Sequence, residues 1–355
     1  MSIVKELQMA YPIIQAPMAG VATPRLAAEV SNAGGLGGLG IAAVNNEKAL
    51  ALIRATQKLT NRPFNINVFC HQSPRQDFIQ EQQWVQFLSP LFESFNTPLP
   101  NYLKDRYPSF KINPGVLKVL LQTRPKVVSF HFGLPSKKEL TLLHRANIYT
   151  IATATSLEEA LLIQESGVKA IVAQGYEAGG HRGIFNPYGP DEKLSTINLL
   201  NVLRPHIQLP LIAAGGIMNG QHIKKALAAG ASAAQLGTAF VACTESAAGN
   251  TYRQHMKNAT NTTQLTAAIS GRPARAIVND FIRYTNRNQN LYPPTFPLAY
   301  DVNKRLQEAA ASQPTHAQVQ SFDVGAYWAG TNVAMARHIP ARQLVNLLVR
   351  ELTTH

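Results

Sequence analysis

The amino-acid sequence predicts an α/β fold, a (β/α)8 TIM barrel with a smaller, mainly helical cap domain built from two insertions. Short β-branched or apolar runs alternate with helical patterns along the chain, and eight such runs occur. The length of 355 residues exceeds a typical barrel of ~250 residues, which leaves room for inserted segments. An open doubly wound sheet usually has fewer strands and a reversal of strand order, so the barrel is favoured.

The eight expected strands are short runs that end at small or polar residues. They cover residues 13–16, 36–41, 64–69, 127–132, 148–152, 170–174, 210–214 and 233–240. Because each run is followed by a helical pattern, the strands are expected to be parallel, with their carboxyl ends meeting on one face of the barrel.

The helices between these strands have recognisable ends. Thr23 before Pro24 predicts one helix start, and Ser156 with Glu159 predicts a capping box at another. The last helix is expected over residues 340–352, where it would complete the outer ring. Glycines suited to left-handed C-caps stand at Gly34, Gly167 and Gly230.

Two segments interrupt the alternation. Residues 72–112 are rich in glutamine, proline and aromatic residues, and residues 258–312 begin with the sequence NATNTT. Both follow the carboxyl ends of strands, so they are expected to form a cap and substrate-binding domain over the site. The barrel would then comprise the three remaining segments, residues 1–71, 113–257 and 313–355.

Composition limits the class of partner. The formal net charge is +13, yet no block of five or six basic residues occurs, so nucleic acid is not expected as a partner. Residues 246–305 carry +6 of this charge, from eight basic and two acidic side chains. Two cysteines form neither a disulfide framework nor a zinc site, and no secretory signal or 18-residue apolar run is present. We expect a cytoplasmic protein with no metal and no membrane partner.

Five segments at the expected strand ends could carry chemistry: QAPMAG, FNINVF, AQGYEAGGHRG, AAGGI and QLGTAF. Glycines in the last two are what a barrel phosphate site needs, because backbone N–H groups and a helix N-terminus then face the anion. Asn65 and Asn67 alternate along the second segment, and buried amides need polar partners that a planar heterocycle could supply. Together these features favour a phosphate-bearing cofactor.

Three other side chains have more than one interpretation. His181 follows two glycines and could act as an acid or base over a ligand, although a loop histidine is commonly just solvated. His131 could belong to the site or to the core. Cys70 could be reactive, but a buried inert thiol is more common, and no lysine or arginine adjoins it. Neither a P-loop nor a GxGxxG motif that opens a helix is present.

The segments QAPMAG, NINVF, VAQGYEAGGHRG, LIAAGGI and QLGTAF occur in this order, and the chain in this respect resembles the nitronate monooxygenases, formerly called 2-nitropropane dioxygenases. The resemblance implies FMN at the barrel mouth and His181 as the catalytic residue. By the same resemblance, the flavin would contact Pro17, Met18, Ala19, Asn67, Gln174, Gly179 and Gly180. Its phosphate would be held by Gly215, Gly216, Gln235, Leu236, Gly237 and Thr238.

The resemblance also implies the substrate site and the reaction. Class I enzymes of this family have an aromatic and lysine motif, which corresponds to Tyr292, Phe296, Tyr300 and Lys304 at intervals of four; the family usually has tyrosine where Phe296 stands. Prolines argue against a helix before Tyr300. The expected substrate contacts are His131, Phe296, Tyr300 and Lys304. The implied reaction is oxidation of a small anionic nitronate, such as propionate 3-nitronate, with O2 to a carbonyl compound and nitrite.

Three alternatives remain at this point. A related FMN- and NAD(P)H-dependent enoyl-acyl-carrier-protein reductase shares much of these motifs and would differ in its need for a nicotinamide. A tRNA dihydrouridine synthase would need proline where His71 follows Cys70, and a basic RNA-binding domain. The third alternative is a barrel that binds FMN without turnover.

Overall fold

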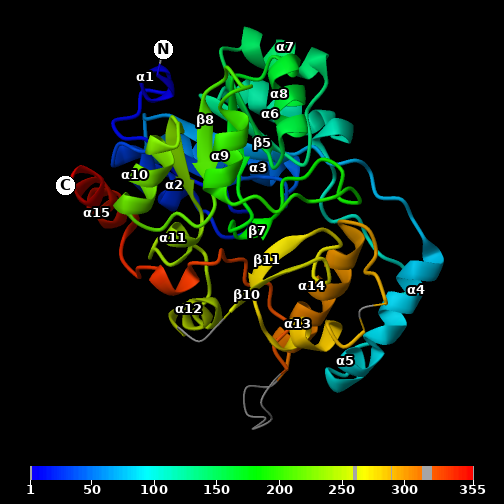
Figure 1. Cartoon of the computed structure of the whole chain (residues 1–355). Helices are drawn as coiled ribbons and strands as arrows, with labels where there is room; N and C mark the ends of the chain where they lie inside the picture. Colours follow the sequence, from blue (N-terminus) through cyan, green and yellow to red (C-terminus); the bar gives the residue numbers. More distant parts are fainter. Residues whose placement is uncertain (1, 259–261, 289, 314–321, 355) are drawn as a thin grey trace.

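The computed structural model describes residues 2–258, 262–288, 290–313 and 322–354, and its largest sheet is an eight-stranded parallel barrel (Figure 1). Its strands run in the order β1, β9, β8, β6, β5, β4, β3, β2. A parallel bridge between Ile14 and Leu36 brings β1 to the segment that enters β2, which nearly closes the barrel. The predicted fold class is confirmed.

The barrel strands agree closely with the predicted runs. They are β1 (Ile13–Gln15), β2 (Gly37–Gly40), β3 (Phe64–Phe69), β4 (Val127–His131), β5 (Tyr149–Ala154), β6 (Ala170–Gln174), β8 (Leu211–Ala214) and β9 (Ala233–Leu236). The predicted strand over residues 233–240 is wrong beyond Leu236. The chain turns at Gly237 into the short helix α11 (Thr238–Val241), where Phe240 is fully buried. A short apolar run suits a strand or a buried helix equally, so periodicity could not separate them.

Helices alternate with these strands around the barrel. They are α1 (Ile3–Glu6), α2 (Pro24–Asn32), α3 (Asn46–Leu59), α6 (Pro114–Thr123), α7 (Lys137–Arg145), α8 (Leu157–Ser166), α9 (Thr196–Leu203), α10 (Gly220–Ala228) and α15 (Ala341–Thr353). The predicted start of α2 is confirmed, because the Thr23 hydroxyl accepts a hydrogen bond from Leu26 N at 3.0 Å. The glycines predicted as C-caps have positive φ, with values of 93°, 89° and 93° at Gly34, Gly167 and Gly230.

The predicted capping box at α8 is only half present. Ser156 Oγ accepts from Glu159 N at 3.3 Å, but the Glu159 carboxylate accepts from Thr155 N, at 2.6 Å, and not from Ser156 N. The same carboxylate also accepts from Phe185 N, at 2.6 Å. Glu159 is therefore drawn away from Ser156 by the loop that follows β6.

A second group of elements lies beside the barrel in Figure 1 and has its own hydrophobic core, which includes Trp84, Phe92, Phe281 and Val302. Its helices are α4 (Phe78–Phe87), α5 (Ser89–Ser94), α13 (Asp280–Thr285) and α14 (Leu298–Ala311). Three further short helices, η1 (Phe110–Ile112), α12 (Asn250–Lys257) and η2 (Val333–Met335), pack outside this core: Phe110 lies in the barrel core, and α12 and η2 pack together against α11. An antiparallel sheet joins β10 (Thr263–Thr266) and β11 (Ala274–Ile277) to β7 (Gly180–His181). The second insertion is predicted to begin with the sequence NATNTT, and residues 259–261 of that sequence lie outside the described residues.

The two inserted segments contact each other. Asp301 on α14 is fully buried and accepts hydrogen bonds from the Arg106 and Arg305 side chains and from Lys104 N. Tyr284 on α13 donates to Phe87 O at 3.0 Å. These contacts place residues from both insertions in one packed unit.

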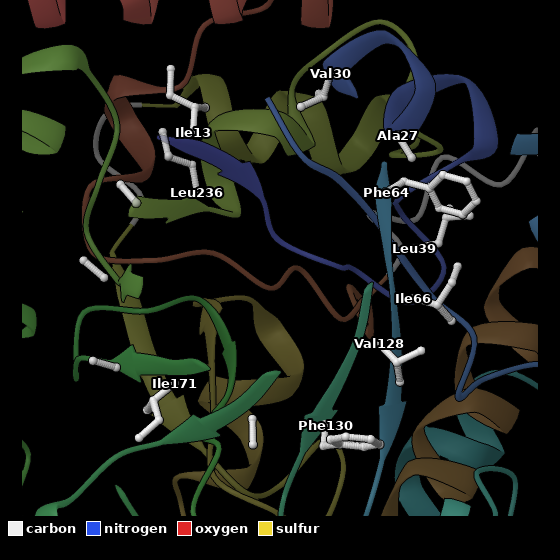
Figure 2. Close-up of a cluster of buried hydrophobic side chains, with 14 of the residues drawn as sticks. Ile13, Ala27, Val30, Leu39, Phe64, Ile66, Val128, Phe130, Ile171 and Leu236 are labelled. Atoms are coloured by element: carbon white, nitrogen blue, oxygen red, sulfur yellow. The ribbon is translucent and has the colours of Figure 1, made fainter. Parts of the chain in front are cut away.

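The barrel core is built from the inward and helix-facing sides of the strands. Figure 2 shows part of it, with Ile13, Leu39, Ile66, Val128 and Ile171 among the buried side chains. This core fixes where the carboxyl ends of the strands meet. No helix in the described part of the chain is long and apolar enough to cross a membrane.

Candidate active site

A cavity of about 250 Å³ lies where the carboxyl ends of the strands meet the second group of elements. The barrel side chains that line it come from six strands: Asn67, Ser129, His131, Thr153, Val172, Gln174, Ala214 and Gln235. The other elements contribute an opposing wall of Tyr107, Tyr252, Phe296, Tyr300, Lys304 and Trp328. The cavity thus lies between the barrel and both inserted segments, and both parts supply its walls.

Nearly all residues predicted for the site line this one cavity. They are Pro17, Met18, Ala19, Asn67, His131, Gln174, Gly179, Gly180, His181, Gly215, Gly216, Gln235, Gly237, Thr238, Phe296, Tyr300 and Lys304. Leu236 does not line it, because this side chain is 1% exposed and packs in the barrel core (Figure 2). Tyr292, from the aromatic motif, is 71% exposed and also lies outside the lining.

The loop after β6 places His181 at the cavity. His181 pairs with Ala274 of β11, and its carbonyl accepts hydrogen bonds from Gln174 Nε2 at 3.0 Å and from His131 Nε2 at 3.2 Å. Next to it, Arg182 is 1% exposed and forms an ion pair with Asp191 at 2.8 Å. The loop is therefore held by strand pairing, by side chains from the barrel and by a buried ion pair.

Burial keeps both cavity histidines neutral at pH 7. Burial, with smaller contributions from the neighbouring His131 and Arg272 side chains, lowers the pKa of His181 to about 3. Burial also lowers the pKa of His131 to about 4, against the opposing effect of its hydrogen bond to His181. Neutral imidazoles have a nitrogen that can accept a proton or a hydrogen bond. Of the two interpretations of His131, the structure shows features of both: the side chain lines the cavity and is hydrogen-bonded to Thr153 Oγ1 and His181 O.

Cys70 is fully buried and does not line the cavity. Burial raises the pKa of its thiol well above the usual range. A reactive cysteine needs an accessible thiolate. The structure therefore places Cys70 in the barrel core, as the commoner of the two interpretations predicts.

One end of the cavity is lined by backbone. Gly215 and Gly216 have φ values of 125° and 68°, which an L side chain rarely adopts. At Gly237 an added Cβ would meet only Ala16 Cβ, at 3.6 Å, so its side chain would occupy the cavity itself. The first turn of α11 begins at the next residue, Thr238. This glycine cradle and the adjoining helix start fit a phosphate-bearing cofactor such as a flavin nucleotide.

The opposite end is aromatic and contains an amine. Tyr107 and Tyr300 stack with their ring centroids 4.9 Å apart, and Lys304 Nζ lies 5.4 Å from the Tyr300 ring centroid. The helix α14 starts directly after Pro297, so Tyr300 and Lys304 share a helical face, and Phe296 precedes the helix. The sequence argued against a helix before Tyr300, and the structure agrees only up to Pro297, since Leu298 and Ala299 already belong to α14. Burial, then the charge of Arg106, lowers the pKa of Lys304.

Sequence reasoning missed several lining residues. Ser129 could have been found, because it lies two residues before His131 on the same face of β4 and beside Asn67 of the neighbouring strand β3. Thr153 could have been found in the same way, because Ile151 pairs with Ser129 and Thr153 lies two residues further along β5. Tyr107 and Trp328 come from irregular segments, for which periodicity gives no direction. Asn332 Nδ2 donates to Gly216 O at 2.7 Å, and only the tertiary structure brings these two residues together.

A parallel barrel with a glycine cradle and a neutral histidine in one cavity fits the class of flavin-dependent barrel oxidoreductases. Comparison with known proteins identifies the family within this class. The family model described as nitronate monooxygenase matches residues 2–351. The chain belongs to the nitronate monooxygenase family, whose members are flavin-dependent oxidoreductases.

Named relatives agree with this assignment. A nitronate monooxygenase from Paraburkholderia phytofirmans is 50% identical over 342 residues, which is 96% of this chain and 92% of the relative. One from Pseudomonas aeruginosa is 45% identical and covers 98% of this chain and 97% of its own. The solved structure of nitroalkane oxidase from Streptomyces ansochromogenes superimposes with a TM-score of 0.88 at 36% identity, covering 98% of this chain and 97% of that one.

Proposed function

We propose that this chain uses FMN and O2 to oxidise small anionic alkyl nitronates, such as propionate 3-nitronate, to a carbonyl compound and nitrite. The observation that carries the proposal is the charge of the cavity. Lys304 and the neutral His181 line it, and none of the described lining residues is Asp or Glu. Such a cavity favours an anion over a cation.

The flavin would occupy the barrel side of this cavity. Gly215, Gly216, Gly237 and Thr238 would hold the phosphate, because they combine backbone N–H groups, a helix start and space without side chains. Pro17, Met18, Ala19, Asn67, Gln174, Gly179, Gly180 and Gln235 would contact the rest of FMN. Bound FMN would supply the two-electron chemistry that amino-acid side chains lack.

The substrate would occupy the remaining space, between the aromatic wall and His181. Lys304 would attract its carboxylate, and Tyr300 and Phe296 would exclude water. A nitronate has already lost its carbon proton. With a neutral nitroalkane, His181 would act as the base: the carbon–hydrogen bond breaks, the proton moves to the imidazole and the electron pair stays on the nitronate.

The first test is oxygen uptake by the purified flavoprotein with propionate 3-nitronate and no NAD(P)H, with nitrite measured in parallel. Uptake with nitrite release is expected. His181→Asn should keep its flavin and lose turnover of a neutral nitroalkane, such as nitroethane, about 10²-fold or more, because the base that takes the carbon proton is gone. His206→Asn, at an exposed position after α9, is the matched control and should match the parent protein. A flavin-loaded protein that consumes no oxygen until a nicotinamide is added would contradict the proposal and support an enoyl reductase.

We also propose that residues 72–112 and 258–312 act together as the cap. Their shared contacts at Asp301 and the aromatic wall that they contribute support this division. The two cysteines are both free and buried, which suits a reducing compartment, and we propose the cytoplasm.

A further inference from the structure

A buried hydroxyl contacts the His181 ring from outside the cavity. Ser270 lies in the turn between β10 and β11, is fully buried and does not line the cavity. Its Oγ lies 2.9 Å from His181 Nε2. The same Oγ lies 3.1 Å from the carbonyl oxygen of Arg272 and 3.3 Å from the Arg272 backbone nitrogen. The Ser270 hydroxyl thus has three hydrogen-bonding neighbours, and its one proton can go to only one of them.

The proton count among these neighbours selects one arrangement. A carbonyl oxygen only accepts, and a backbone N–H only donates. If Ser270 donates to Arg272 O, it can accept from both Arg272 N and a protonated His181 Nε2, and all three contacts are hydrogen bonds. If Ser270 instead donated to His181 Nε2, the Arg272 carbonyl would lose this donor. Because an unmade buried hydrogen bond is costly, the first arrangement is favoured.

The other ring nitrogen faces a different environment. His181 Nδ1 is not among the buried atoms without a partner, and no described residue hydrogen-bonds to it. Because His181 lines the cavity, this nitrogen reaches the open space. We propose that Ser270 is a positioning residue that holds His181 as the Nε2–H tautomer, so that the unprotonated Nδ1 faces the substrate cavity.

The surroundings of His181 preserve this arrangement. The His181 ring packs between Trp328, Phe296 and Phe132, whose ring centroids lie 5.0, 5.5 and 5.6 Å from its own. Strand β7 pairs with β11, and Arg182 N donates to Pro273 O at 2.9 Å, so the turn that carries Ser270 stays in register with His181 (Figure 1). The ring therefore has little freedom to turn away from the hydroxyl.

The two cavity histidines differ in the partners of their ring nitrogens, and His131 has protein partners for both. Its Nε2 contacts the His181 carbonyl, so Nε2 carries the proton, and its Nδ1 accepts from Thr153 Oγ1 at 3.1 Å. Both of its nitrogens are used within the protein. Between these two histidines, His181 is the one that presents a free acceptor nitrogen to the cavity.

The test is a long-range ¹H–¹⁵N correlation spectrum of the flavin-loaded protein labelled with ¹⁵N-histidine, at pH 7. The signal that disappears in His181→Asn identifies His181. The parent protein should show the Nε2–H pattern, and Ser270→Ala should show a mixture with, or a change to, the Nδ1–H pattern. Ser270→Thr, which keeps the hydroxyl, should restore the parent pattern.

Thr266→Val is the matched control, because Thr266 Oγ1 accepts from Ala268 N at 3.1 Å in the same turn without contacting His181. It should keep the Nε2–H pattern. An Nδ1–H pattern in the parent protein would overturn the inference even if Ser270→Ala did not fold. An unchanged pattern in a folded Ser270→Ala would also overturn it.

The use of Nδ1 by the substrate rests on the proposed function, and turnover tests it separately. Turnover of Ser270→Ala with a neutral nitroalkane, such as nitroethane, should fall about 10- to 100-fold, because the Nδ1–H tautomer cannot take the carbon proton, while Thr266→Val should match the parent. A changed tautomer with unchanged turnover would support the assignment for Ser270 and contradict the proposed role of His181.

Discussion

His71 offers a sharp test of the electrostatics around the site. It is 1% exposed, and neither of its ring nitrogens has a hydrogen-bond partner within the described part of the chain. Its ring meets Phe296 edge-on, with centroids 4.9 Å apart, and it does not line the cavity. Burial, and then the charges of Arg272 and Lys111, lower its pKa from 6.5 to about 3. Replacement of His71 by leucine should therefore stabilise the protein.

The size of this effect depends on pH. Because the pKa is lower in the folded state, protons bind preferentially to the unfolded state once the pH falls below 6.5, and the parent loses stability down to about pH 3. The loss is ~1.4 kcal/mol per pH unit, or about 2 kcal/mol between pH 7 and pH 5. His71→Leu escapes this loss. At pH 7 the variant should also gain about 1–3 kcal/mol, because two unpartnered buried atoms are removed.

Urea-induced unfolding of the parent and of His71→Leu at pH 7 and pH 5 measures both effects. The stability advantage of the variant should be about 2 kcal/mol larger at pH 5 than at pH 7. The same substitution at the exposed His206 is the control and should show no such increase. An equal advantage at both pH values, or a variant less stable than the parent at pH 5, would refute the reasoning.

Three further changes test the site and its support. Gly237→Val should reduce the amount of flavin bound per protein, measured by absorbance. The φ of −101° at Gly237 tolerates a side chain, and that side chain would fill the cavity. A full flavin content would count against the glycine cradle. Lys304→Met should raise KM for propionate 3-nitronate at least tenfold, with a smaller change in kcat, because ~1.4 kcal/mol of anion binding is lost. An unchanged KM would contradict the role of Lys304 in binding the substrate carboxylate. Asp191→Asn should lower the free energy of unfolding by about 1–3 kcal/mol in denaturant titrations, because the buried Arg182 loses its carboxylate and keeps only the neutral acceptors Gln174 O and Gly175 O. No measurable loss would contradict this.

The strands and most helix ends could be predicted because their signals are local. Apolar runs such as residues 64–69 and 170–174 match β3 and β6, and the Thr23–Pro24 pair begins α2 where expected. The run at residues 233–240 could not be assigned correctly. Its apolar residues suit a strand or a short buried helix, and the packing of Phe240 beyond Gly237 selects the helix.

The residues on the barrel side of the cavity could be predicted, because barrel geometry places strand ends together. His131, Gln174 and Gly215 lie at or just after strand ends, and closure of the barrel brings these positions together whatever the loops do. The sequence alone therefore determined the fold class and most of the barrel side of the cavity, including its glycines and His181.

Only the tertiary structure decided the opposite wall and the state of the histidines. Tyr107, Trp328 and Ser270 come from segments without a period, so their positions depend on how the two insertions pack. The neutrality of His181 and the proposed choice of its protonated nitrogen depend on burial and on a hydroxyl 89 residues away in sequence. Desolvation and hydrogen bonding act through space, and no local pattern in the chain encodes them.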